Sequence, residues 1–156
     1  IPLMFIGSAN TSLDAKNRFI IPAKFRKHIN QDEAQKFIIN KGVLNCIDVY
    51  PLSSWRKIEQ KLSKLNPFNP KDAKFLRIFT LHANECEADN QYRIILPQVL
   101  LDYANIEKEI LVVGMADKLE LWNPKEYEKY LNISSDEYEI LTQEVMGGDL
   151  DVPKFT

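Results

Sequence analysis

Five basic side chains between residues 15 and 28 are the strongest candidates for chemistry in this sequence. They are Lys16, Arg18, Lys24, Arg26 and Lys27, and no acidic residue interrupts them. Ammonium and guanidinium groups neutralise phosphates, and the planar fork of arginine can also reach a guanine edge. A run of basic residues can equally be an ordinary solvated face. The segment by itself therefore predicts either a surface for a polyanion or a solvated basic face.

A turn that starts with an aspartate and ends with an arginine must position the first of these side chains. Asp14 stands at the entry to a polar turn, and Arg18 closes the turn four positions later. An aspartate at this place commonly accepts backbone N–H groups of the turn. We expect Asp14 to be structural, either as a cap or in an ion pair with Arg18. For Arg18, an ion pair with Asp14 and a contact to DNA are equally favoured.

A degenerate copy of this turn occurs 75 positions later, with Asp89 matching Asp14 and Arg93 matching Arg18. Three apolar residues and then a proline follow the arginine in both copies. The apolar triplet suits a buried strand, and the proline suits the first turn of a helix. Each copy thus predicts a strand, the Asp-to-Arg turn, a second strand and a short helix, and the repeat implies duplicated structural units.

A further pair of strands is expected after each copy. Residues 37–39 and 46–50 flank a turn that contains Gly42, and residues 110–113 and 119–122 repeat this arrangement at an offset of 72. Apolar runs of this length bounded by turn residues indicate strands. The sequence therefore predicts an α+β fold built from two β-β-α-β-β units.

Amphipathic helices are expected between and after the repeats. Helical spacing of apolar residues predicts helices over residues 55–65 and 72–81, and Asn123 with Pro124 predicts another helix start. A capping-box-like opening at Ser134 predicts a last helix. Its expected apolar face consists of Tyr138, Leu141 and Val145. The aromatic residues that we interpret as core packing rather than base stacking are Trp55, Trp122, Tyr127 and Tyr130.

Charge is divided unevenly along the 156 residues, although the net charge is only −2. Residues 1–79 contain 14 Lys and Arg against 6 Asp and Glu, whereas residues 80–156 contain 6 against 16. Such asymmetry between halves indicates charged partners. If copies of the chain associate, the acidic half of one copy is expected to pair with the basic half of the next in a head-to-tail contact. No apolar run approaches the roughly 18–20 residues of a membrane span.

Catalytic and metal sites are not predicted. Cys46 and Cys86 lie 40 residues apart without a C-x-x-C motif, which favours two reduced thiols over a zinc cage. The two histidines, His28 and His82, have no nucleophile and carboxylate at a recognisable spacing. No glycine-rich phosphate loop occurs either. We therefore expect no enzyme activity, no cofactor, no metal and no small-molecule substrate.

Several motifs together resemble the MraZ family of bacterial proteins. They are the opening Met4-Phe-Ile-Gly7, the two D-x-x-x-R turns, Tyr50-Pro51 with Trp55, and His82-Ala-Asn-Glu-Cys86. The resemblance runs from Met4 to roughly Gly148, and we expect Met4 to be the natural start. It implies two SpoVT–AbrB-type halves that form a swapped-hairpin, barrel-like core with peripheral helices. Tyr92 departs from the family pattern, and because tyrosine adopts positive φ poorly, a different backbone is expected for the second turn.

The resemblance also implies how the chain is divided. We expect a first SpoVT–AbrB-like repeat over residues 7–54, connecting helices over residues 55–81 and a second repeat over residues 82–125. Residues 126–156 are expected to form a C-terminal helix and an acidic tail.

The function that the resemblance implies is transcriptional regulation of the division and cell-wall gene cluster that contains its own gene. The resemblance further implies a ring-shaped homo-oligomer that binds direct repeats in double-stranded promoter DNA. With this resemblance, DNA contact is favoured for the five basic residues of the first repeat, whereas Asp14, Asp89 and Arg93 are expected to be structural. A cytoplasmic, nucleoid-associated location follows, with no membrane partner.

Two other functions remain open. One is a ring-forming scaffold that binds protein partners through its acidic half. The other is an antitoxin-like relative of AbrB that masks a toxin.

Overall fold

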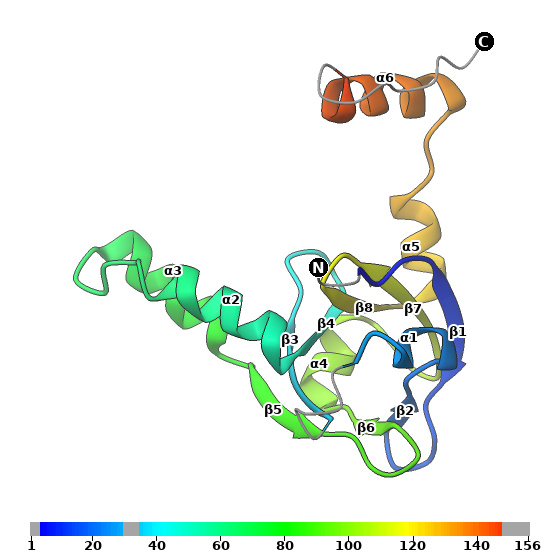
Figure 1. Ribbon diagram of the computed structural model, residues 1–156, viewed down its shortest axis with the longest axis horizontal. Helices are drawn as coiled ribbons and strands as arrows, with labels where there is room; N and C mark the ends of the chain where they lie inside the picture. The colour runs from blue at the N-terminus through cyan, green and yellow to red at the C-terminus, as the bar shows by residue number, and fades with distance from the viewer. Residues whose placement is uncertain (1–3, 30–34, 148–156) are drawn as a thin grey trace. The chain divides into compact units, whose positions relative to one another are not determined.

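The predicted duplication of strand and helix units is present in the structure. The computed structural model describes residues 4–29 and 35–147, and Figure 1 shows its elements. The first repeat contains β1 (Ser8–Ser12), β2 (Arg18–Ile20), α1 (Ala23–Arg26), β3 (Lys36–Lys41) and β4 (Ile47–Pro51). The second repeat contains β5 (Asn84–Glu87), β6 (Arg93–Ile95), α4 (Gln98–Tyr103), β7 (Glu109–Met115) and β8 (Lys118–Trp122). The fold is therefore mixed α+β with two β-β-α-β-β units.

The two repeats exchange strands with each other. The six-stranded sheet has the order β1-β7-β8-β4-β3-β5, and β2 pairs with β6 in a separate two-stranded ribbon. The first strand of each repeat pairs antiparallel with the third strand of the other, β1 with β7 and β5 with β3. The fourth strands, β4 and β8, also pair across the repeats. Neither repeat therefore has a complete set of hydrogen-bonded strands by itself.

The main hydrophobic core lies between these exchanged strands and the two short helices. Phe19 and Ile94, which face each other across the β2–β6 ribbon, are fully buried. Phe25 of α1 and Leu100 of α4 are fully buried as well. The first and third residues of the apolar triplets thus supply core residues, whereas the middle residues Ile20 and Ile95 are exposed. The prediction of a buried strand is therefore wrong for one position of each triplet, because alternate residues of a strand point to opposite faces.

Two helices between the repeats form an arm that extends from the β3–β4 part of the sheet (Figure 1). They are α2 (Leu52–Leu62) and α3 (Pro70–Thr80), and both confirm predicted helices. The side chain of Asn69 caps α3 by accepting the backbone N–H groups of Lys71 and Asp72 at 3.0 and 3.1 Å. The rings of Trp55 and Phe79 stack at 6.2 Å and attach the arm to a small second core.

Residues 125–156 form a second compact unit, of which residues 125–147 are described. The helices at and beyond this boundary are α5 (Pro124–Tyr130) and α6 (Ser135–Met146). The hydroxyl of Ser134 accepts the backbone N–H of Glu137 at 3.1 Å, which confirms the predicted capping box. The interpretation of Tyr130 as a core residue is wrong, because 56% of it is exposed. Residues 1–3 and residues 148–156 of the predicted tail lie outside the described residues.

A buried ion-pair cluster joins the two repeats at the β4–β8 seam. Asp48 stands directly opposite Glu120, an arrangement that is unfavourable for like charges. The ammonium of Lys118 lies between them, with Nζ 2.9 Å from Asp48 Oδ2 and 3.4 Å from Glu120 Oε2. Burial raises the pKa of Asp48, whereas the neighbouring Lys118 lowers it. Burial alone would lower the pKa of Lys118, but the Asp48 carboxylate raises it and keeps the lysine protonated.

Replacing Lys118 by methionine should therefore destabilise the fold. The variant leaves the 2% exposed Asp48 without its counter-charge, and the free energy of unfolding at pH 7.5 should fall by about 3 kcal/mol. The loss should shrink at pH 5.5, because the raised pKa of Asp48 lets the folded state take up a proton before the unfolded state does. Urea denaturation at both pH values measures this. The control is Lys108→Met, an exposed lysine whose replacement should change stability little.

Candidate nucleic-acid interface

The first Asp-to-Arg turn is held by the carboxylate of Asp14. Its Oδ1 accepts the backbone N–H groups of Lys16 and Arg18, each at 2.9 Å, and its Oδ2 accepts Nε of Arg18 at 2.7 Å. The N–H of Asp14 donates to the carbonyl of Arg18 at 2.9 Å and closes the hairpin. Asp14 therefore caps the turn and pairs with the arginine at the same time. The ion pair with Nε leaves the two terminal Nη nitrogens of Arg18 outside that contact.

The second turn repeats this geometry. Oδ1 of Asp89 accepts the backbone N–H groups of Gln91 and Arg93 at 2.9 Å, and Oδ2 accepts Nε of Arg93 at 2.7 Å. The expectation of a different backbone in the second turn is wrong. Tyr92 has φ of 60°, which matches the 59° of Asn17 at the same place in the first turn.

Tertiary contacts explain why tyrosine is tolerated at this left-handed position. The Tyr92 ring packs against the core, and the guanidinium carbon of Arg26 lies 4.6 Å from the ring centroid. The carbonyl of Tyr92 accepts the N–H of Ile21 at 2.9 Å. These contacts offset a backbone strain of roughly 1 kcal/mol.

The β2–β6 ribbon brings the two arginines onto one outward face. Phe19 and Ile94 point into the core, so their neighbours along each strand point outward. Arg18 stands opposite Ile95 and Arg93 stands opposite Ile20. The two arginines are therefore diagonal neighbours, roughly 7–8 Å apart. The isoleucines beside them are exposed, Ile20 to 43% and Ile95 to 63%.

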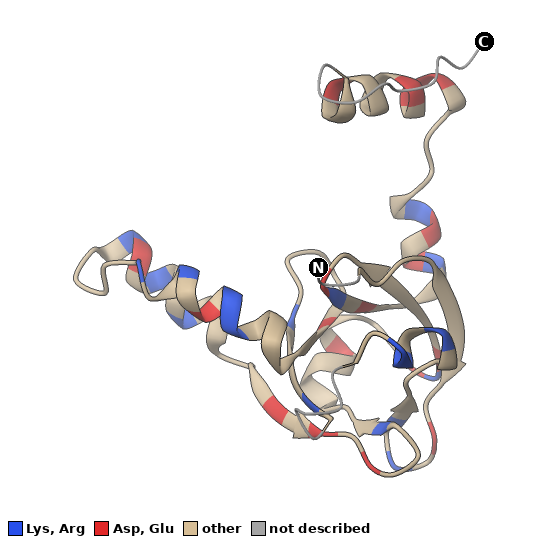
Figure 2. Ribbon diagram, viewed as in Figure 1, with Lys and Arg blue, Asp and Glu red and all other residues tan. Residues whose placement is uncertain are grey.

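Two of the three basic residues in and just after α1 contact the second turn and β1 rather than the first turn. Arg26 donates from Nε to the carbonyl of Ile21 at 2.9 Å and covers Tyr92 of the second turn. Lys24 donates to the carbonyl of Ser8 at 3.1 Å. Lys27 is exposed at the end of α1, as is Lys16 in the first turn. Figure 2 shows the basic residues on α1, on the segment that leads into β2 and along the α2–α3 arm.

All five predicted residues therefore lie at the surface, with Arg18 and Arg26 partly buried and the three lysines exposed. The sequence did not indicate that Arg93 would share the face of Arg18. That juxtaposition depends on the pairing of β2 with β6, two segments that are far apart in the sequence. The match between the two copies of the turn was the signal that could have indicated such a pairing.

The hydrogen bonds keep both aspartates of the turns ionised. The backbone N–H of Arg18, followed by its side chain and the N–H of Lys16, holds the pKa of Asp14 below the usual value. The corresponding groups of Arg93 and Gln91 lower the pKa of Asp89. The turns are therefore fully charged at neutral pH, and Arg18 keeps its anchor.

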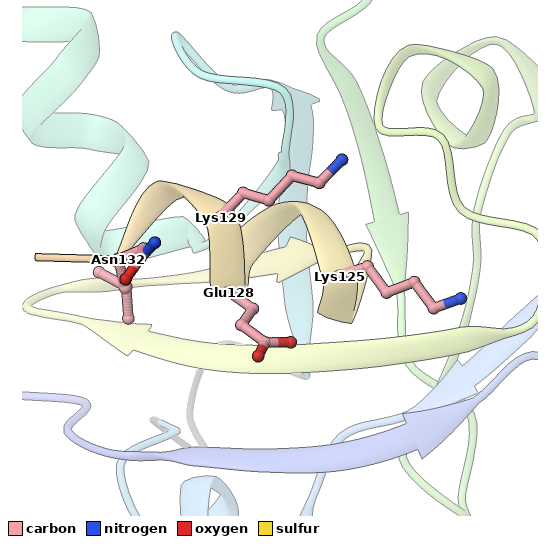
Figure 3. Close-up of a pocket in the computed structure, with 5 residues that line it drawn as sticks. Lys125, Glu128, Lys129 and Asn132 are labelled. Carbon is pink, nitrogen blue, oxygen red and sulfur yellow. The ribbon is translucent and has the colours of Figure 1, made fainter.

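Two other places in the described structure could be mistaken for ligand sites. Cys46, Asp48 and Glu120 offer donor atoms within 4.8 Å of one another. Burial raises the pKa of the Cys46 thiol, and the Lys118 ammonium already pairs with both carboxylates, so we interpret the cluster as an ion-pair network. Figure 3 shows a hollow beside α5, where the labelled side chains of Lys125, Glu128 and Lys129 point in different directions. They do not converge on a common ligand.

The comparison with known families decides the assignment. The family described as "MraZ protein, putative antitoxin-like" matches residues 4–78 and again residues 79–144. The chain belongs to the MraZ family. The predicted resemblance is thereby confirmed, including the duplication of the unit that defines the family.

Curated relatives from several bacteria support the same assignment. A protein of Moorella thermoacetica named "Transcriptional regulator MraZ" is 43% identical over 148 residues, which cover 94% of this chain and all of the relative. Relatives with the same name from Clostridium tetani and Natranaerobius thermophilus are 43% and 37% identical and cover 91% and 94% of this chain. They align over 96% and 100% of their own lengths.

The family is one of transcriptional regulators, not of enzymes. Within the described residues, no helix is long and apolar enough to cross a membrane.

The two aspartates should make stability depend on pH in a defined way. Because their pKa values are lowered in the folded state, their stabilising contribution is present above the ordinary aspartate pKa of about 3.9 and is lost as the pH falls further. The variant Asp14→Asn/Asp89→Asn should melt at a lower temperature than the wild type at pH 6. This difference should shrink as the pH falls through the lowered pKa values of the two aspartates.

Thermal denaturation followed by circular dichroism between pH 2 and pH 6 tests this expectation. Glu107→Gln/Glu109→Gln removes two exposed carboxylates and serves as the matched control. If the melting temperature of the Asp14/Asp89 double variant falls with acid as steeply as that of the wild type, while the control loses this dependence, the two aspartates do not stabilise the fold in the way stated here.

Proposed function

We propose that this chain is a sequence-specific DNA-binding regulator of transcription, in which the outward face of the first Asp-to-Arg turn contacts DNA. The observation that carries this proposal is the Arg18 side chain, held at Nε by Asp14 on the surface beside the exposed Lys16. An anchored guanidinium loses little side-chain entropy when it binds. Its Nη fork suits a phosphate or the O6 and N7 atoms of guanine.

The basic residues of α1 supply a second group of contacts in this proposal. Lys24 and Lys27 are exposed and suit phosphate oxygens, which fix the position of a protein on DNA without reading sequence. Arg26 is held at Nε by the carbonyl of Ile21 and lies over the Tyr92 ring, and in this proposal its Nη nitrogens face the duplex. We assign Lys16, Arg18, Lys24, Arg26 and Lys27 to the DNA interface, and Asp14, Asp89 and Arg93 to the framework that holds it.

The resemblance to the family supports a more specific target. We propose that the protein acts on direct repeats upstream of the division and cell-wall gene cluster that contains its own gene, and therefore on the nucleoid in the cytoplasm. Several copies joined in a ring-shaped homo-oligomer would present one basic surface per subunit. Linked weak contacts to successive repeats gain affinity through effective concentration.

The exchanged strands also support a finer description of the fold. We propose that the six-stranded sheet and the β2–β6 ribbon together form an AbrB-like swapped-hairpin barrel. In this description residues 7–54 and 82–125 are the two SpoVT–AbrB-like repeats, residues 55–81 are connecting helices, and residues 126–156 are the C-terminal helix and acidic tail.

A gel-shift experiment tests the function. The wild-type protein should shift the upstream region of its own gene in preference to unrelated DNA of equal length, at both 50 and 200 mM salt. The variant Lys16→Ala/Lys24→Ala/Lys27→Ala should bind more weakly. The logarithm of its association constant should also fall less steeply with the logarithm of the salt concentration, with a slope that is smaller in magnitude by about 0.9 for each phosphate that is no longer neutralised.

A matched triple variant controls for the loss of charge. Lys57→Ala/Lys61→Ala/Lys64→Ala also removes three exposed lysines, but from the segment of α2 and its end. It should retain DNA binding. Equal loss in both triple variants would refute the assignment to the first repeat, and equal binding of wild type to both DNAs would refute a sequence-specific regulator in favour of a scaffold.

The two arginines of the ribbon provide an internal comparison. Arg18→Gln and Arg93→Gln each remove the same bond to an aspartate, so their melting temperatures should decrease by similar amounts. Only Arg18→Gln should weaken specific DNA binding, by roughly 10- to 100-fold if the arginine binds a base through both Nη nitrogens. Fluorescence anisotropy with the two proteins measures this. A similar weakening for Arg93→Gln would show that both repeats contact DNA.

A further inference from the structure

The outer side of α3 carries an exposed stripe in which apolar and basic residues are interleaved. Phe75 and Ile78 are each 49% exposed, and Leu81 at the end of the helix is 69% exposed. Lys71 and Lys74 fall between them on the same side of a helix with 3.6 residues per turn. This stripe is called the arm stripe below.

The arm is built so that this stripe stays at the surface. Phe79 stacks on Trp55 at 6.2 Å and on Phe75 at 5.3 Å, which fixes the side of α3 that faces α2. The cap at Asn69 fixes the start of the helix. An exposed apolar stripe on a helix that is fixed in this manner is typical of a binding surface.

The helix α6 carries a stripe of the opposite charge. The expected apolar face of the last helix is at the surface, because Tyr138, Leu141 and Val145 are 58%, 52% and 67% exposed. Ile140, beside them, is 58% exposed. Glu137 and Glu144 are interleaved with them on the same side and line a hollow of about 300 Å³ together with Ile140 and Leu141. The four charged residues of α6 are all acidic, as Figure 2 shows.

We propose that α6 of one copy docks on the arm stripe of a neighbouring copy. The two helices have 11 and 12 residues, so their lengths match at about 16 and 18 Å. The apolar residues would form the centre of the contact, and the lysines of α3 would pair with the glutamates of α6. Such charge complementarity sets the partner and its orientation more than the affinity.

A contact of this kind joins two different surfaces of one chain, and is therefore heterologous. Each copy offers one arm stripe and one α6, so the contact repeats from copy to copy and closes when the rotation completes a ring. This inference rests on the proposed homo-oligomer and names the surfaces that build it. It does not depend on which residues contact DNA.

Charge reversal on each surface tests the proposal. Lys71→Glu/Lys74→Glu gives a copy with two acidic surfaces, and Glu137→Lys/Glu144→Lys gives a copy with two basic surfaces. Each variant alone should self-associate at least roughly tenfold more weakly than the wild type in sedimentation velocity. The chain that carries all four substitutions should assemble again. A 1:1 mixture of the two double variants should also assemble, because each copy then meets a complementary neighbour.

The outcomes separate the possible occupants of the arm stripe. The fourfold variant has complementary surfaces within each chain, whereas the mixture has them only between chains. Assembly of the fourfold variant without assembly of the mixture would therefore overturn the proposal in favour of docking within one chain. Unchanged assembly of both double variants, or weaker DNA binding of Lys71→Glu/Lys74→Glu with normal assembly, would also overturn it. A wild-type protein that is monomeric would overturn both this contact and the proposed ring, while the DNA measurements on Arg18 would remain a separate test.

Two controls address folding and general charge effects. Lys57→Glu/Lys61→Glu makes the same charge change on α2 and should leave assembly intact. Circular dichroism checks that α6 remains helical, because Glu137 also belongs to its capping box. Glu137→Gln/Glu144→Gln keeps a side-chain oxygen for Ser134 and provides a milder change of α6 that should weaken assembly in the same direction.

Discussion

The exchange of strands between the two repeats is the constraint on which the rest of the structure depends. Each repeat contributes its first strand to a sheet position beside the third strand of the other. An unpaired strand would leave buried N–H and C=O groups without partners, at a cost of about 1–3 kcal/mol for each group. The two repeats therefore have to fold as one body, with Phe19 and Ile94 buried against each other in its core.

This exchange also determines where the charged groups lie. The Asp-to-Arg turn of the first repeat precedes β2, and the turn of the second precedes β6, so the pairing of these strands brings Arg18 and Arg93 onto one face. It also places α1 beside the second turn, where Arg26 covers Tyr92. A basic helix of the first repeat thus packs on the turn of the second, so the second repeat helps to position the proposed DNA surface of the first.

Charge has different physical roles in different parts of the molecule. At the β4–β8 seam, Lys118 is the shared ion-pair partner of two carboxylates that are largely removed from water, so the interaction bears on stability. In the two turns, partly exposed aspartates orient arginines and contribute more to geometry than to stability. On α3 and α6, exposed charges are interleaved with apolar residues, an arrangement that suits the choice of a partner.

The local features of this protein were determined by its sequence alone. The carboxylate of Asp14 or Asp89 could be assigned to its turn because it reaches backbone groups only two and four residues away. The Ser134 capping box and the helices between the repeats follow from equally short spacings. The tertiary structure alone decided the strand exchange, the positive φ of Tyr92, the shared face of Arg18 and Arg93, and the exposure of the apolar sides of α3 and α6. These features depend on contacts between segments that are distant in the sequence, and the free energy of such contacts is not encoded in the spacing of neighbouring residues.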